Sequence, residues 1–142
     1  MLNFFKEDVS KPDLDFERIE HWLNLAITKN NFIFGALNFI FCSDEYLLKI
    51  NNEYLNHDYY TDVITFNYNE ANIVSGDIFI STERVKENAL EFNISEKEEL
   101  CRVIIHGVLH LVGFDDKVKE DKEKMTREEN EYLKDFFDVN KL

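Results

Sequence analysis

Residues 100–116 read Leu-Cys-Arg-Val-Ile-Ile-His-Gly-Val-Leu-His-Leu-Val-Gly-Phe-Asp-Asp. Nearly every residue in 100–112 is apolar, which predicts a helix that is buried on most of its sides. The polar exceptions are Arg102, His106 and His110, which follow one another at intervals of four residues and therefore share one stripe of the helix. We expect the rest of the fold to pack around this helix and to leave the stripe accessible.

Two imidazoles one helical turn apart can bind a single metal ion. Gly113 can adopt the left-handed conformation that ends a helix, so the chain can turn back and bring Asp115 and Asp116 near the imidazoles. We predict a metal site formed by His106, His110 and Asp116. Three protein ligands leave one position for water, as in catalytic zinc sites, although iron or nickel also suits these atoms. The alternative is a pair of core histidines hydrogen-bonded to carbonyl groups.

The spacing of these ligands matches that of the metzincin proteases, with an aspartate in the last ligand position. Those enzymes need a glutamate directly after the first histidine, where it accepts a proton from the attacking water. This chain has Gly107 there, which has no side chain to accept a proton. The sequence therefore argues against peptide hydrolysis by that route.

The remaining patterns predict an α+β fold in which a small mixed four-stranded sheet carries packed helices, with the metal-site helix buried against it. We expect one domain over residues 1–142, because 44% of the residues are hydrophobic and no linker or repeat interrupts the chain. The expected order is strand, helix, strand, helix, two strands and three helices. The predicted strands after the first are 32–41, buried on both faces, and a neighbouring pair, 63–68 and 77–81; the predicted helices are 15–27, one starting at Ser43, 82–92, 95–112 and 119–137.

The composition narrows the class of protein further. No stretch is long and apolar enough to span a membrane, and the first residues do not resemble a signal peptide, so we expect a cytoplasmic protein. Cys42 and Cys101 are expected to be buried thiols rather than a disulfide. A formal charge of −13 opposes general affinity for nucleic acid, so any such role must use a local site.

Three segments resemble the YbeY family of bacterial endoribonucleases. The family signature His-Gly-x-x-His-Leu-x-Gly-Tyr/Phe-Asp-His is matched by residues 106–116 except at the last position, where Asp116 stands in place of the third histidine. Residues 61–66, Thr-Asp-Val-Ile-Thr-Phe, and 76–81, Gly-Asp-Ile-Phe-Ile-Ser, are similar to two further family motifs. Leu55 occupies the position of a family arginine that is considered important for activity, so the expected cation is missing from the cleft.

The resemblance implies a metal-dependent endoribonuclease that cuts single-stranded RNA during small-subunit ribosomal RNA maturation and ribosome quality control. It further implies one Zn²⁺ per chain, or another divalent transition metal. The expected partner is ribosomal RNA or a pre-ribosomal particle, and binding to DNA or to a membrane is not expected. The ion would lower the pKa of a bound water and polarise a phosphoryl oxygen. By the same resemblance Thr61 and Asp62 border the cleft, the alternative being a turn in which Asp62 caps backbone amides.

Two other functions stay open. One is a metal-stabilised ribosome-assembly factor that cuts little or nothing, which Leu55 and the acidic charge favour. The other is an unconventional hydrolase of peptides or small molecules. Asn51 either contacts the substrate or bonds the backbone, and Arg102 either attracts a phosphate or pairs with Glu98. His57 lies in a loop that is expected to line the cleft.

Overall fold

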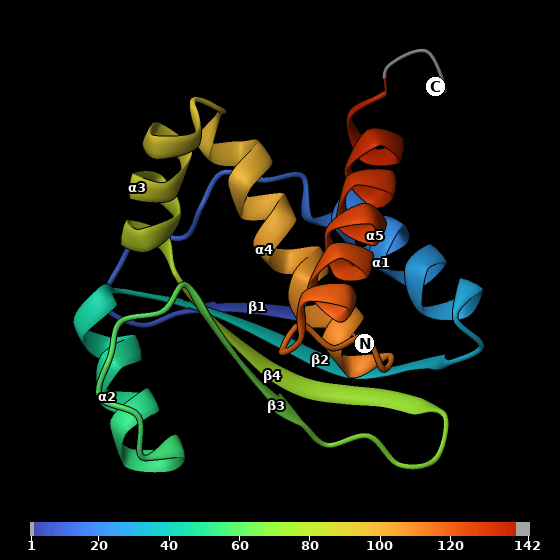
Figure 1. The fold of residues 1–142 in the computed structure, drawn as a ribbon, viewed down its shortest axis with the longest axis horizontal. Helices are drawn as coiled ribbons and strands as arrows, with labels where there is room; N and C mark the ends of the chain where they lie inside the picture. The colour runs from blue at the N-terminus through green and yellow to red at the C-terminus, as the bar shows by residue number, and fades with distance from the viewer. Residues whose placement is uncertain (1, 139–142) are drawn as a thin grey trace.

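The computed structural model describes residues 2–138, and the strands in this part of the chain form one mixed sheet (Figure 1). Its order is β1-β2-β4-β3. The strands β1 (Leu2–Lys6), β2 (Ile33–Cys42) and β4 (Ile73–Ser81) are parallel to one another, and β3 (Val63–Asn67) runs antiparallel to β4. The predicted four-stranded mixed sheet is confirmed, and so is the pairing of its last two strands.

The helices begin where the sequence offers capping side chains. Asp15, Ser43 and Ser95 each accept a hydrogen bond from a backbone N–H of the first turn that follows. None of the helices within residues 2–138 is both long and apolar enough to cross a membrane. The helices are α1 (Phe16–Lys29), α2 (Asp44–Leu55), α3 (Thr82–Phe92), α4 (Glu96–Leu111) and α5 (Lys119–Phe137).

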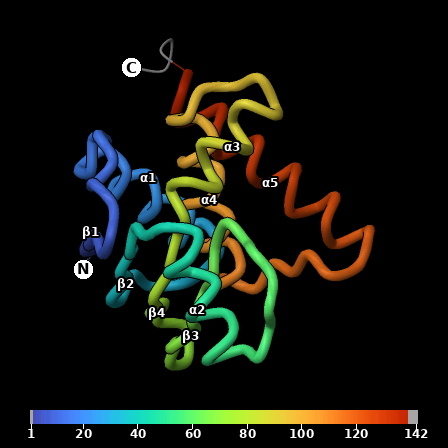
Figure 2. Tube along the Cα trace, turned by 90° about the vertical axis from the view of Figure 1, so that its left-hand side faces the viewer, coloured from blue at the N-terminus to red at the C-terminus, as the bar shows by residue number. Residues whose placement is uncertain are grey.

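The two faces of the sheet are covered unequally (Figure 1). Helix α4 lies on one face, between α1 and α5, as the turned view in Figure 2 makes clear. Apolar side chains of β2 and β4, among them Phe39, Phe41 and Ile78, form the main core with these helices. On the opposite face, α2 forms a smaller core with one end of the sheet. Helix α4 is thus the central element of the larger layer.

The prediction that residues 32–41 are buried on both faces was wrong for the first half of that strand. Ile33 is 55% exposed, whereas every residue from 39 to 42 is buried. The reason is that α2 covers only one end of its face. In the uncovered part, the side chains of Asn3, Asn38 and Asp77 form a hydrogen-bonded row across three strands.

The strand predicted to begin at residue 77 begins at Ile73 and includes Gly76, which does not precede it. A Cβ atom on Gly76 would lie 2.5 Å from the carbonyl oxygen of Phe66, so glycine permits the close pairing of β3 and β4. The expectation for the cysteines is met, since Cys42 and Cys101 are both buried free thiols. Burial raises the pKa of each to about 12, which makes them poor nucleophiles.

Candidate metal centre

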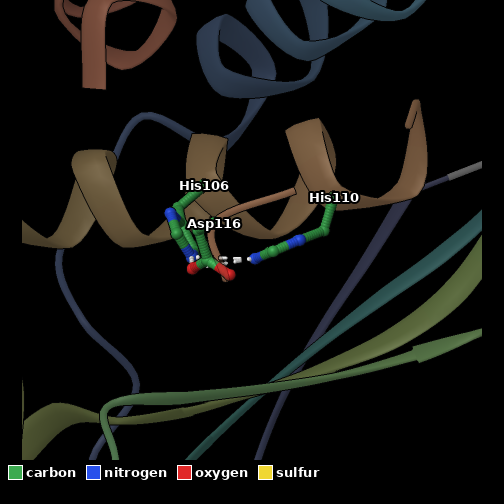
Figure 3. A group of neighbouring side chains, drawn as sticks. All are labelled: His106, His110 and Asp116. Atoms are coloured by element: carbon green, nitrogen blue, oxygen red, sulfur yellow. Dashed lines mark hydrogen bonds and ion pairs between the residues drawn. The ribbon is translucent and has the colours of Figure 1, made fainter. Parts of the chain in front are cut away.

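Helix α4 presents His106 and His110 on the same side, one turn apart (Figure 3). From residue 99 to residue 111, every residue of the helix except Arg102, His106 and His110 is buried. Both imidazoles are partly exposed, in contrast to the fully buried Ile104, Ile105 and Leu109 around them. Asp116 reaches the two rings from the segment after the helix. The structure therefore brings together all three residues that the sequence nominated as ligands.

The ligand atoms converge on one point. His106 Nε2 lies 3.1 Å from His110 Nε2 and 3.3 Å from Asp116 Oδ2, and the remaining distance, between His110 Nε2 and Asp116 Oδ2, is 3.4 Å. Zinc–ligand bonds of about 2.0–2.1 Å at tetrahedral angles place the ligand atoms about 3.3 Å apart. The donor set and its spacing therefore fit a small tetrahedral cation.

The outer nitrogens of both imidazoles already have partners. His106 Nδ1 lies 2.6 Å from Glu129 Oε2, and His110 Nδ1 lies 3.1 Å from the carbonyl oxygen of Phe114. Because both partners are acceptors, each Nδ1 carries the proton and donates it, which leaves both Nε2 lone pairs directed at Asp116. Metal-binding histidines have this arrangement. Carbonyl partners alone, as in a pair of core histidines, would not explain why both Nε2 atoms converge on one carboxylate.

The turn after α4 explains how Asp116 reaches the histidines. Gly113 has a φ of +104°, a conformation that costs glycine little, and it ends the helix as expected. The amide of Phe114 then donates to the carbonyl of Leu109 at 3.0 Å. This turn places both the Phe114 carbonyl beside His110 and the Asp116 carboxylate beside the two rings.

Sequence reasoning missed Glu129, which lies on α5 and is only 7% exposed. Burial by itself would lower the pKa of His106, but the hydrogen bond and charge of Glu129, with Asp116 and Asp62 nearby, raise it. The carboxylate thus orients the imidazole and increases its basicity. One signal was available: Glu129 falls four residues from both Met125 and Leu133, on the buried face of an otherwise highly charged helix.

Arg102 forms an ion pair, as one of the two interpretations held, but with different partners. Its Nη1 lies 3.4 Å from Glu129 Oε1, and its Nε lies 3.9 Å from Glu99 Oε1. Glu98, the partner expected from helical spacing, was the wrong choice, because α5 packs along α4 and supplies the buried carboxylate. Arg102 therefore helps to hold Glu129 in place, and it also lines a cavity that reaches His106 and Asp116.

Replacing Glu129 with glutamine should weaken metal binding on the order of tenfold while the protein stays folded. Glutamine has nearly the same shape but lacks the charge that strengthens the His106 ligand, and loss of such outer partners typically costs about 10- to 100-fold in metal affinity. Competition with a chromophoric chelator measures this change, with Glu131→Gln as the control because Glu131 is exposed on the same helix. Equal affinity in both variants would contradict the role given to Glu129.

Gly107 faces the sheet rather than the metal ligands. A Cβ atom built on it would lie 3.1 Å from two carbon atoms of Ile78 and 3.4 Å from Thr65 Oγ1. Glycine at this position allows α4 to pack closely on β3 and β4. A side chain here would point into the core, so the position is unsuited to a catalytic base for geometric reasons as well as chemical ones.

Two cavities meet at the candidate ligands His106 and Asp116. The loop cavity, of about 450 Å³, opens on the side of the α2–β3 loop and β3. The helix cavity, of about 410 Å³, opens between α4 and α5. Asp62, Val63, His106 and Asp116 line both. The other lining residues of the loop cavity are Asn51, Leu55, His57, Tyr59, Thr61, Ile64, Thr65, Asn67, His110 and Leu111.

The remaining nominated residues lie at these cavities. Thr61 lines the loop cavity, and Asp62 lines both cavities while its carboxylate also accepts backbone amide hydrogen bonds, so its two interpretations coexist. Burial raises the pKa of Asp62, although the nearby His106 opposes this. Asn51 is 2% exposed and donates to the Tyr59 carbonyl at 2.9 Å. Of the two roles considered for Asn51, the structure therefore supports the bond to the backbone. His57 lines the loop cavity, as expected.

Comparison with known proteins places this arrangement in a family. The family model described as "Endoribonuclease YbeY" matches residues 5–137. Proteins named endoribonuclease YbeY are 49% identical in Christiangramia forsetii, covering 93% of this chain and 92% of the relative, and 51% identical in Karelsulcia muelleri, covering 94% of each. The solution structure of TM1509 from Thermotoga maritima is similar with a TM-score of 0.68 and 27% identity, over 96% of this chain and 89% of that one. The chain belongs to the YbeY family, as residues 106–116 led us to expect.

Proposed function

We propose that this protein is a metal-dependent endoribonuclease that cuts single-stranded RNA in the maturation and quality control of small-subunit ribosomal RNA. Family membership supports the endoribonuclease activity, since the matched relatives carry that name. The observation that carries the metal dependence is the convergence of two Nε2 atoms and one carboxylate oxygen, with both Nδ1 atoms taken by acceptors. The chain acts as a single domain, in the cytoplasm, on pre-ribosomal particles.

His106, His110 and Asp116 are proposed to hold one Zn²⁺, with other divalent transition metals as alternatives. A bound ion of this kind supplies a Lewis acid and hydroxide at neutral pH. The chain itself supplies the oriented imidazoles and an open approach from two cavities. Asp116 adds a negative charge that a third histidine would not have, so an ion held here would lower the pKa of a bound water less than an ion held by three imidazoles.

A non-cleaving ribosome-assembly factor is the second candidate, and one observation favours it. Among the described residues that line the loop cavity, none is a lysine or arginine, and Leu55 lies at its rim with 42% of its surface exposed. The loop cavity therefore offers no lysine or arginine among its described lining residues to neutralise the negative charge of an RNA phosphate. Peptide hydrolysis is disfavoured, because Gly107 faces Ile78 and has no side chain that could act as the protease base.

The test is cleavage of a single-stranded ribosomal RNA fragment by the purified protein, with the same sequence in a duplex and a peptide mixture as alternative substrates. We expect single-stranded RNA alone to be cut. A chelator should abolish the cleavage, and one equivalent of zinc or another divalent metal should restore it. Failure to cut RNA with every metal tried, while the protein still binds pre-ribosomal particles, would transfer the assignment to the assembly factor.

A further inference from the structure

We propose that Tyr59, braced by His57, is a stacking platform for an unpaired nucleobase of the RNA, beside the three candidate metal ligands. This inference rests on the proposed function, because it names the residue that holds the substrate of that same site. It concerns binding, so it is testable without any cleavage. The relevant contacts all lie in the segment between α2 and β3.

Tyr59 is an exposed aromatic ring in a cavity shared with the candidate ligands. It is 56% exposed, and it lines the loop cavity together with His106, His110 and Asp116. The imidazole of His57 stacks on it, with ring centroids 5.1 Å apart and planes 21° apart, and His57 Nδ1 lies 3.0 Å from the Tyr59 hydroxyl oxygen. The ring is thus held in orientation while much of its surface stays open to a ligand.

The buried side chain of Asn51 fixes the loop that carries both rings. The backbone carbonyl of Asn51 accepts a hydrogen bond from the backbone amide of His57 at 3.1 Å. The side-chain amide of Asn51 donates to the backbone carbonyl of Tyr59 at 2.9 Å. Between them Asn56 takes the left-handed conformation, with a φ of 55°, that ends α2. A platform that is ordered before binding loses little conformational entropy when a base stacks on it.

The charge of the cavity explains why stacking, and not phosphate pairing, would hold the RNA here. The chain has a formal charge of −13, and none of the described residues lining the loop cavity is a lysine or arginine. Stacking on an aromatic ring needs no cation and accepts any base, because every base has a π-face. It also selects single strands, since bases in a duplex are already stacked on their neighbours.

The neighbouring Tyr60 has a different role, so the proposed stacking role belongs to Tyr59 and not to Tyr60. The hydroxyl of Tyr60 donates to Glu45, and its ring lies 5.7 Å from the guanidinium of Arg84. Tyr60 therefore anchors the loop to α2 and α3 and does not line the loop cavity. Of the two adjacent exposed tyrosines, Tyr59 alone lies in the cavity with the candidate ligands.

The experiment is fluorescence anisotropy with a labelled hexaadenylate, with the protein kept metal-free by a chelator so that metal-dependent cleavage cannot destroy the probe. We expect Tyr59→Leu to weaken binding by on the order of tenfold or more, which is the usual loss for one stacked base. Tyr59→Phe keeps the ring but loses the hydroxyl contact with His57, so it should bind far more tightly than Tyr59→Leu. Tyr68→Leu, which removes a similarly exposed tyrosine outside the cavity, should also bind like wild type.

A second probe of the same length, with abasic residues throughout, separates stacking from backbone contacts. Wild type should bind it at least as weakly as Tyr59→Leu binds hexaadenylate. The proposal is overturned if Tyr59→Leu binds hexaadenylate like wild type, if wild type does not distinguish the two probes, or if wild type binds neither. Because the probes are not cut, absence of RNA cleavage in the separate activity assay would count against the proposed function and leave this result standing.

Discussion

The His110→Ala variant should lose both metal binding and RNA cleavage while it keeps its fold. His110 supplies one of three converging ligand atoms, and its removal leaves two, so the loss should exceed the roughly 10- to 100-fold cost of removing an outer partner. The imidazole is partly exposed and contacts the Phe114 carbonyl at the end of α4, so its loss removes little of the core. Metal content per chain and the cleavage rate of single-stranded RNA are the two readouts.

The matched control is His21→Ala, which removes an exposed histidine from α1, remote in sequence from residues 106–116. Its metal content and cleavage rate should equal those of wild type. Both variants pass through the same purification, so a contaminating ribonuclease would act equally in each. Cleavage by His110→Ala at the wild-type rate would mean that the activity does not depend on this site.

Replacing Gly107 with glutamate, which would restore the protease motif in sequence, should instead prevent stable folding. The new Cβ would lie 3.1 Å from two atoms of Ile78, and the carboxylate would enter the core without a partner. An unpaired buried charge costs several kcal/mol, which is comparable to the whole stability of a small domain. Thermal unfolding followed by circular dichroism should show a large decrease in Tm or no cooperative transition.

Lys97→Glu is the control for that variant, because it introduces glutamate at an exposed position in the first turn of the same helix. Its stability should lie within about 0.5 kcal/mol of wild type. Gly107→Ala should fall between the two. Alanine favours a helix interior by about 1 kcal/mol, but its methyl group must displace Ile78 by a few tenths of an ångström. A folded, protease-active Gly107→Glu variant would contradict the packing argument.

Most of the fold follows from local signals in the sequence. Capping side chains such as Ser43 and Ser95 define where helices begin, and the apolar stripe of α5 gives its full extent. The predictions of burial were wrong where burial depends on which part of the sheet a helix covers. Residues 33–36 are apolar, yet they are not buried, because α2 covers only the far end of that face of the sheet. No local pattern reveals how far a helix extends over a sheet.

The candidate ligands were predictable because all three lie within residues 106–116, where helical spacing and one glycine turn determine their positions. Glu129 was not, since it reaches His106 only through the packing of α5 on α4. The same packing gives Arg102 its partner. The two rings near the site, His57 and Tyr59, come together through the hydrogen bonds of Asn51, and no local sequence pattern indicates these bonds.

The most direct test of the central claim is the rate of single-stranded RNA cleavage as metal is added back stepwise to metal-free protein. The account predicts that the rate rises in proportion to metal and stops rising at one equivalent per chain, because His106, His110 and Asp116 form one site. The His110→Ala variant should give no rise over the same range. A rate that is independent of metal, or a variant that follows the wild-type curve, would contradict the claim that this centre cuts RNA.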